Sequence, residues 1–363
     1  MIRLFDQKTT GYDDCIKKVL EHKQFINGPE VKELEEKLAQ YVGVKYAIGV
    51  SSGTDALLIS LMAINIKEGD EVITSPYTWI STAEVIKLLG AKIVFCDIEK
   101  DTFNICPNSI KNKITNKTKA IIPVSLFGHI YDVNKIQKII KKNNIYVIED
   151  AAQSFGSIYK DNRKSCSLSD IGCTSFFPTK PLGCFGDGGM CFTNNDILAE
   201  KIRTIRNHGA ITKHNYKYLG INGRLDTIQA AILIKKFENF ENDISKRIKI
   251  SIFYNTLFLK NKDVQILKTK KYCKRNVYAQ YTILLKDEKT RDSLKNHLKQ
   301  DNIQVGVFYP KPLNLVKTIS DEYEEMYNAE DKSKRALSLP IYPSMTYDEF
   351  TKIKNSINNF FNI

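Results

Sequence analysis

The first half of the chain alternates short runs rich in β-branched and aromatic residues with longer amphipathic stretches. This alternation is typical of an α/β fold, in which a mostly parallel sheet is covered by helices on both faces. Ligands of such sheets bind at the carboxyl ends of the strands, so polar residues just after a strand are the first candidates for a site. The predicted strands are 46–50, 71–74, 92–96, 120–124, 146–149, 173–176 and 190–192, and the main helices are 54–66, 81–89, 133–142 and 197–207.

The pattern changes in the second part of the chain. A long helix is expected over 225–243, a basic loop-rich segment follows, and residues 278–285 alternate like an antiparallel strand. We therefore expect a large domain over residues 1–240 with a seven-stranded sheet and a smaller α+β domain over 241–363. The N-terminal segment, about residues 1–25, is expected to pack near the smaller domain.

The composition limits the classes of protein to which this chain can belong. The 363 residues are 42% hydrophobic, without an apolar run near the twenty or so residues of a membrane span, and the first residues lack the apolar core of a signal peptide. None of the eight cysteines has Cys-x-x-Cys spacing, and the five histidines form no convincing cluster. We expect a cytoplasmic protein with reduced thiols, no metal site and no membrane partner.

The formal net charge of +13 raises the possibility of nucleic-acid binding. The lysines are spread along the chain, with local clusters near 111–119 and 268–275, and no known nucleic-acid module is present. We therefore expect no nucleic-acid partner. A basic surface would instead attract an anionic substrate such as a nucleotide-sugar.

Three residues after predicted strands suggest one cofactor, pyridoxal 5'-phosphate (PLP). Lys180 follows the strand 173–176, and Asp150 and Gln153 follow the strand 146–149. A lysine amine can form a Schiff base with the cofactor aldehyde, and a carboxylate can keep the pyridine nitrogen protonated. The glutamine amide could bond the phenolic oxygen. Taken alone, each residue has an ordinary alternative: a solvated lysine, or an aspartate that caps a helix.

Other residues near strand ends could complete such a site. Gly53 and Thr54 stand where a strand passes into a helix, and free amides at a helix start bind phosphate, although an ordinary capped helix start fits equally well. Ser175 is a second phosphate candidate. Trp79 could stack on a cofactor ring, while a core or interface aromatic is the alternative.

With these residues, the chain resembles the DegT/DnrJ/EryC1/StrS family of nucleotide-sugar aminotransferases, which are fold-type-I PLP enzymes like aspartate aminotransferase. The resemblance covers nearly the whole chain and is strongest for the subgroup that aminates UDP-2-acetamido-2-deoxy-3-oxo-glucuronate. Its motifs are Phe25-Ile26-Asn27-Gly28-Pro29, Ser52-Gly53-Thr54-Asp55-Ala56, Glu149-Asp150-Ala151-Ala152-Gln153, residues 175–180, Gly186-Asp187-Gly188-Gly189, residues 222–226, Tyr309-Pro310 and Ser338-Leu339-Pro340.

The resemblance implies a role for each matching residue. The catalytic pair would be Lys180 and Asp150. Asn222 would reach the phosphate of the partner subunit, which implies a homodimer with shared sites. The remaining cofactor contacts would be Gly53, Thr54, Trp79, Gln153 and Ser175, and the substrate side would hold Arg224, Phe308 and Tyr309. Relatives often carry histidine where this chain has Phe308, so the exact sugar stays open.

The expected activity is amino transfer from L-glutamate to a nucleotide-linked ketosugar in surface-polysaccharide synthesis. The cofactor would alternate between PLP and pyridoxamine 5'-phosphate, and 2-oxoglutarate would leave. A 4-keto-sugar aminotransferase of the same fold is the main alternative. A sugar dehydratase fits less well because related dehydratases replace the lysine by histidine, and a nicotinamide-dependent dehydrogenase lacks its glycine fingerprint here. A non-catalytic regulator is suggested only by the charge.

Overall fold

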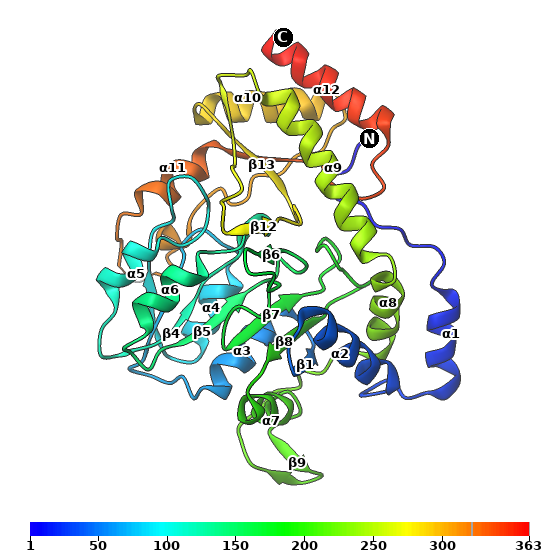
Figure 1. The fold of residues 1–363 in the computed structure, drawn as a ribbon, viewed down its shortest axis with the longest axis vertical. Helices are drawn as coiled ribbons and strands as arrows, with labels where there is room; N and C mark the ends of the chain where they lie inside the picture. The colour runs from blue at the N-terminus through cyan, green and yellow to red at the C-terminus, as the bar shows by residue number, and fades with distance from the viewer. Residues whose placement is uncertain (321, 363) are drawn as a thin grey trace.

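A central seven-stranded sheet organises the computed structural model, which describes residues 1–320 and 322–362 (Figure 1). Its strand order is β1-β8-β7-β5-β4-β2-β3, and β8 alone runs antiparallel to its neighbours. The predicted α/β fold with a mostly parallel sheet is confirmed. The strands are β1 (Tyr46–Val50), β2 (Glu71–Thr74), β3 (Lys92–Phe95), β4 (Thr118–Ile122), β5 (Tyr146–Asp150), β7 (Ile171–Ser175) and β8 (Gly189–Thr193).

Helices cover both faces of this sheet because neighbouring strand residues point to opposite sides. Ile122 and Ile148 pack into one apolar cluster with α3, α4 and α7, whereas Ile121 and Val147 pack into another with α5 and α6. Near β1 and β8, α2 and α8 cover this second face. These helices are α2 (Pro29–Val42), α3 (Gly53–Ala63), α4 (Ser81–Leu88), α5 (Pro107–Lys113), α6 (Val133–Ile140), α7 (Asp196–Ile205) and α8 (Thr227–Phe237).

A three-stranded antiparallel sheet, in the order β11-β13-β14, lies in the C-terminal part of the chain. It packs with α9, α10 and α12 in a separate apolar cluster. The predicted strand 278–285 corresponds to β13, which is antiparallel as expected. The elements are α9 (Phe240–Phe258), β11 (Val264–Ile266), β13 (Tyr281–Leu285), α10 (Glu288–Gln300), α11 (Tyr327–Arg335), β14 (Ala336–Leu339) and α12 (Tyr347–Phe361).

The prediction of one helix over 225–243 is wrong. The chain forms α8, leaves helical geometry near Asn239 (φ −110°, ψ 6°), and continues as α9. The apolar pattern continues across the break because each helix has a buried side of its own. The helix α8 packs on α2, whereas α9 turns towards the C-terminal sheet. Phe240 and Ile244 of α9 lie in the cluster beside the central sheet, and Tyr254 and Phe258 lie in the C-terminal cluster. A domain boundary near residue 240 stays a prediction.

The N-terminal segment contacts both parts of the molecule. Ile2 forms a parallel bridge with Ile303 and packs in the C-terminal cluster. Farther along, α1 (Asp13–His22) packs on α8 instead. The segment thus runs from the C-terminal sheet down the side of the molecule to the helices of the central sheet (Figure 1).

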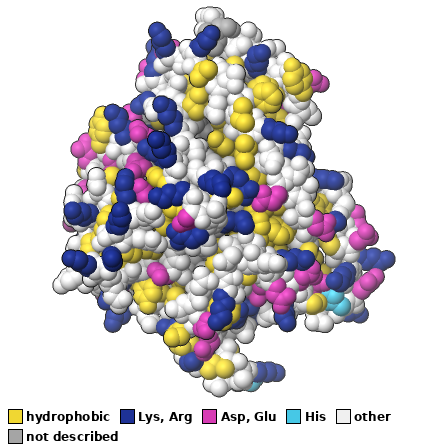
Figure 2. All heavy atoms as spheres, in the orientation of Figure 1, with side chains coloured by type: hydrophobic (Ala, Val, Ile, Leu, Met, Phe, Trp, Pro, Cys, Tyr) yellow, Lys and Arg dark blue, Asp and Glu magenta, His cyan; other side chains and the backbone are white. Residues whose placement is uncertain are grey.

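Basic side chains gather across the middle of one face of the molecule (Figure 2). They lie over the two-stranded pair β6 (Ile158–Tyr159) and β12 (Cys273–Arg275). Part of this charge is balanced, because Arg275 pairs with Glu241 at 2.6 Å and Lys270 with Asp101 at 3.0 Å. No helix among the described residues has the length and apolar character needed to cross a membrane.

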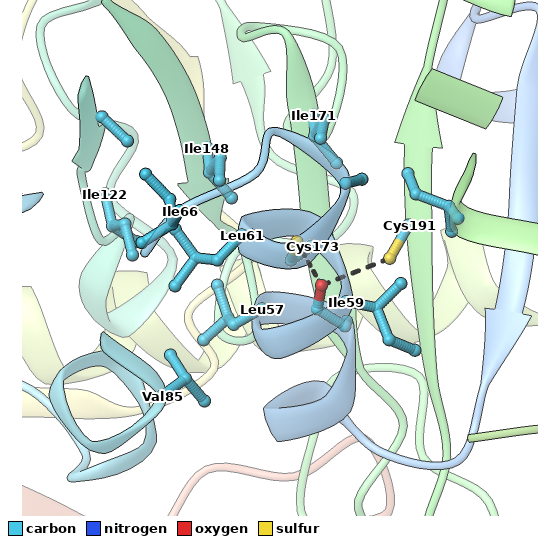
Figure 3. Packing of buried hydrophobic residues seen from close by; sticks show 14 of the residues in the cluster. Leu57, Ile59, Leu61, Ile66, Val85, Ile122, Ile148, Ile171, Cys173 and Cys191 are labelled. Carbon is cyan, nitrogen blue, oxygen red and sulfur yellow. Dashed lines mark hydrogen bonds between the residues drawn. The ribbon is translucent and has the colours of Figure 1, made fainter. Parts of the chain in front are cut away.

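The core around α3 joins the helix to the sheet (Figure 3). The Ser60 hydroxyl donates to the Ala56 carbonyl at 2.6 Å and lies 3.2 and 3.6 Å from the sulfurs of Cys173 and Cys191. Leu61 is fully buried beside them. All eight cysteines are free thiols. This core fixes the helix whose first turn faces the site described below.

A Leu61→Ala substitution is expected to lower the free energy of unfolding by about 3 kcal/mol, because it removes buried methyl groups and leaves a cavity. Urea unfolding followed by circular dichroism measures the change. Leu88→Ala is the matched control: Leu88 is 71% exposed, so the same truncation should change stability by less than about 0.5 kcal/mol. Equal destabilisation by the two variants would contradict the packing described here.

Candidate active site

Two adjacent parallel strands deliver the central polar side chains to one edge of the sheet. Asp150 is the last residue of β5, Ser175 is the last residue of β7, and Lys180 follows in the loop after β7. Asp150 is only 6% exposed, whereas Lys180 is half-buried. The carboxylate and the ammonium group are close enough for each to shift the other's pKa.

The electrostatics of this pair are set by burial. Burial raises the pKa of Asp150, opposed by a hydrogen bond donated by the Thr82 hydroxyl at 2.7 Å, by the Ala152 amide at 3.2 Å and by the Lys180 charge. Burial lowers the pKa of Lys180, opposed by the Asp150 charge. A buried carboxylate requires cationic or hydrogen-bonding partners, and here it has both. A lysine with a lowered pKa suits nucleophilic and proton-transfer chemistry.

Glu149, the neighbouring carboxylate, points to the opposite face of the sheet, as strand alternation predicts. It accepts hydrogen bonds from Ser125 at 3.0 Å, Ser165 at 2.7 Å and the Cys166 amide at 2.8 Å. Burial raises its pKa to about 7. Glu149 therefore fixes the loop behind the sheet, and Asp150 is the carboxylate on the side of Lys180.

The start of α3 forms a narrow cradle next to Ser175. Ser52 caps the helix by accepting a hydrogen bond from the Asp55 amide at 3.0 Å, and the first amides of the helix have no intrahelical acceptor. A Cβ added to Gly53 would lie 2.6 Å from the Cβ of Ser175. The Thr54 hydroxyl bonds Ser81 at 2.7 Å. Glycine, free amides and hydroxyls in one place fit a phosphate group.

Gln153 and a group of aromatic rings adjoin the pair. The Gln153 carbonyl oxygen accepts from the Phe127 amide at 2.9 Å, which directs the amide nitrogen to the Tyr309 hydroxyl at 3.1 Å. The ring of Trp79 lies 6.3 Å from that of Tyr309 and is 58% exposed, so one side of Trp79 is open. This arrangement fits a planar ligand ring beside Trp79, with the Gln153 amide at its rim.

Two contributors were missed in the sequence, Thr82 and Tyr77. The fully buried Tyr77 donates its hydroxyl to the Phe308 carbonyl at 2.6 Å and accepts from the Tyr309 amide at 2.9 Å, so it fixes the segment that carries both aromatic residues. No local signal marked these residues, because their partners are distant in the chain. The only hint was their place after β2, at the same sheet edge as Asp150.

Asn222 and Arg224 lie beside the start of α3 rather than at the Asp150–Lys180 pair. The Ser51 amide donates to the Gly223 carbonyl at 3.0 Å, and Arg224 donates to the Asn207 side chain at 2.7 Å. Asn222 is exposed in the single chain. The buried Nε of Arg224 has no hydrogen-bond partner among the described residues.

A lysine opposite a buried carboxylate at strand ends, with a phosphate cradle on a helix start, defines a PLP-dependent enzyme of fold type I. No group of three or more His, Cys, Asp or Glu residues in the described part of the chain could hold a metal ion. Residues 8–358 match the DegT/DnrJ/EryC1/StrS aminotransferase family, and the chain belongs to this family of PLP-dependent sugar aminotransferases.

Three similar proteins show how closely the chain follows this family. It is 46% identical over 333 residues, 91% of this chain and 90% of the relative, to the UDP-2-acetamido-2-deoxy-3-oxo-D-glucuronate aminotransferase of Pseudomonas aeruginosa. It is 36% identical, covering 98% and 94%, to the UDP-N-acetyl-3-dehydro-alpha-D-glucosamine 3-aminotransferase of Acidithiobacillus ferrooxidans. The crystal structure of NtdA from Bacillus subtilis, solved with its cofactor PMP, superposes with a TM-score of 0.90 at 28% identity, covering 97% and 81%.

A Thr82→Val variant is expected to shift the acid limb of the pH–kcat/KM profile to higher pH by about one unit. Without the Thr82 hydroxyl the ionised form of Asp150 loses a hydrogen bond, so the folded-state pKa rises and the carboxylate protonates at a higher pH. Initial rates from pH 5 to 9 give the profile. Thr78→Val is the control, because Thr78 bonds Thr82 at 3.1 Å but not Asp150. An unchanged acid limb in Thr82→Val would refute the assignment.

Proposed function

We propose that this aminotransferase moves the amino group of L-glutamate to carbon 3 of UDP-2-acetamido-2-deoxy-3-oxo-glucuronate or a closely related 3-oxo sugar. The observation that carries this proposal is the 46% identity, over 91% of the chain, to an enzyme named for that substrate. The second relative is also named for a UDP-linked 3-oxo sugar, which supports the same position. We place the enzyme in the cytoplasm, in a surface-polysaccharide pathway.

Lys180 and Asp150 would carry the chemistry. The bound cofactor supplies an aldehyde for the amine and a ring that accepts electrons from the substrate carbon. Lys180 Nζ would take the proton from the α-carbon of glutamate and, in the second half-reaction, give a proton to the sugar carbon. Asp150 would hold its negative charge towards the ring nitrogen, with Thr82 keeping that charge in place. Glutamate leaves as 2-oxoglutarate, and the ketosugar leaves as the amino sugar.

The cradle at α3 would hold the cofactor phosphate through Gly53, Thr54 and Ser175. The close approach of Gly53 to Ser175 supports this role, because any larger residue would fill the space. Gln153 would bond the phenolic oxygen with its remaining amide hydrogen. Trp79 would stack on the ring with its open side.

We propose a homodimer in which Asn222 reaches the partner's phosphate. The hairpin β9 (Ala210–Thr212) and β10 (Asn215–Tyr216) projects from the body of the chain, close in sequence to Asn222 (Figure 1). It exposes Ile211 (55%), Tyr216 (62%) and nearby Leu219 (87%). Exposed apolar side chains on a projecting hairpin support burial against a second copy.

The substrate side would include Arg224, Phe308 and Tyr309. The Gln153 side chain donates a hydrogen bond to the Tyr309 hydroxyl at 3.1 Å, which supports a position for Tyr309 beside the proposed cofactor. Phe308 comes directly before Tyr309, and the centres of the two rings lie 6.0 Å apart. A 4-keto-sugar aminotransferase is the alternative, and it would use the same cofactor residues with a different sugar orientation.

The first test compares Lys180→Ala with the native enzyme. The native protein supplied with PLP, glutamate and the 3-oxo UDP-sugar should form the 3-amino sugar, detected by mass spectrometry and NMR. Lys180→Ala should lose at least about 10⁴ in kcat, because both proton transfers depend on the amine. Parallel assays with 4-oxo UDP-, dTDP- and GDP-sugars decide whether the enzyme aminates carbon 3 or carbon 4 of the sugar. Faster turnover of a 4-oxo sugar would favour the alternative.

The second test mixes two inactive variants, Lys180→Ala and Asn222→Ala. A mixed dimer would contain one site with both Lys180 and the partner's Asn222, so activity should return on mixing after partial unfolding and refolding. Each variant refolded alone is the control and should stay inactive. If the mixture stays as inactive as its components, Asn222 does not act across the interface.

A further inference from the structure

A cavity of about 730 Å³ lies on the side of the molecule where the N-terminal segment runs past the junction of α8 and α9. Its walls are residues 5–8 and 10–12 of the N-terminal segment, the loop 178–183, the end of α8, the start of α9 and residues 343–344. Lys180 is part of its lining, so the cavity adjoins the loop that carries the reactive amine. Its volume is in the range of pockets that bury small-molecule ligands.

Arg247 is a buried cation in this lining, and it forms no ion pair with any residue that the structure describes. It is 5% exposed, and its Nη1 donates to the carbonyls of Ile341 at 3.0 Å and Tyr278 at 3.4 Å. Its buried Nε has no hydrogen-bond partner among the described residues. Burial lowers the pKa of Arg247 to about 10, with only the Asp243 charge opposing. A buried charge left in this state is costly.

Lys236 adds a second cation in the same wall. Its Nζ donates to the Gln7 side chain at 2.9 Å and the Gly183 carbonyl at 2.6 Å, and it lies 4.2 Å from the centre of the Phe185 ring. An ammonium group has three donors, so one remains. Burial lowers the pKa of Lys236 to about 8. By contrast, the adjacent Lys235 is exposed and paired with Glu238 at 2.6 Å.

The cavity also adjoins the proposed substrate side of the active site. Phe5 lines the cavity, and its ring lies 6.3 Å from the ring of Phe308. Gln7, which bonds Lys236, belongs to the same N-terminal segment. The cavity and the proposed substrate side therefore share the N-terminal segment as a common wall.

We propose that this cavity is an oxyanion-binding subsite of the active site, in which Arg247 and Lys236 hold a phosphate or carboxylate group of a reactant. This proposal rests on the proposed function, because that function supplies the anions: the diphosphate of the nucleotide-sugar and the carboxylates of glutamate and 2-oxoglutarate. An oxyanion accepts hydrogen bonds from guanidinium and ammonium donors and would neutralise two charges that form no ion pair within the described part of the chain. Exposed Lys246 at the same cavity adds to the attraction.

The test is isothermal titration of the PLP-saturated dimer with UDP and, separately, with 2-oxoglutarate. Lys236→Gln removes the charge and keeps a polar side chain, and it should raise at least one of the two dissociation constants about tenfold. The probe whose binding weakens identifies the group that the subsite holds. Weaker binding of UDP indicates the diphosphate, and weaker binding of 2-oxoglutarate indicates a carboxylate. Lys236→Arg should restore most of the lost affinity. Arg247→Lys, which retains charge in the buried position, should give a smaller loss.

The matched control is Lys249→Gln, the same charge change at an exposed position of α9 that does not line the cavity. It should leave both constants unchanged. Native dissociation constants for both probes in Lys236→Gln would overturn the subsite, and so would equal weakening by Lys249→Gln. Failure of the proposed function looks different: the native protein would then bind PLP but transfer no amino group from glutamate to the 3-oxo UDP-sugar.

Discussion

The site depends on the electrostatic attraction between the Asp150 carboxylate and the Lys180 ammonium group. Each group is disfavoured in its charged form by burial, and each is stabilised by the other's charge. The parallel neighbours β5 and β7 bring them together, because their carboxyl ends meet at one edge of the sheet. The cradle at the start of α3 is fixed against the same edge by a core of close-packed residues from α3, β7 and β8. The strand β7 thus takes part in both the charged pair and the packing that holds the cradle.

The strength of a buried charge pair depends on the groups that hold it. Thr82 and the Ala152 amide leave Asp150 little freedom to turn, and Glu149 fixes the opposite face of the same strand end. Hydrogen bonds from Tyr77 and Gln153 hold the aromatic segment at Phe308 and Tyr309 in place as well. A ligand ring placed here would meet a surface that is already organised, which lowers the cost of ordering groups on binding.

Much of this could be predicted from the sequence. The strands 46–50 and 71–74 were predicted with the bounds that the structure has, and the positions of Asp150 and Lys180 after adjacent strands predicted their meeting. The helix 225–243 was wrong because apolar periodicity does not record a change in helix direction at Asn239. Thr82 and Tyr77 were missed because a hydroxyl has no sequence signature when its partner is far along the chain. Which residues touch the cofactor and substrate stays a prediction.

The helix α9 has a mechanical consequence. Its first turns pack beside the central sheet and its last turns belong to the C-terminal cluster, with nineteen residues in one continuous helix. A continuous helix resists bending, so α9 links the position of one cluster to that of the other. A swing of the C-terminal sheet about the central one, taken up at Asn239 where the backbone departs from helical geometry, would therefore have to pull Phe240 and Ile244 out of the cluster beside the central sheet.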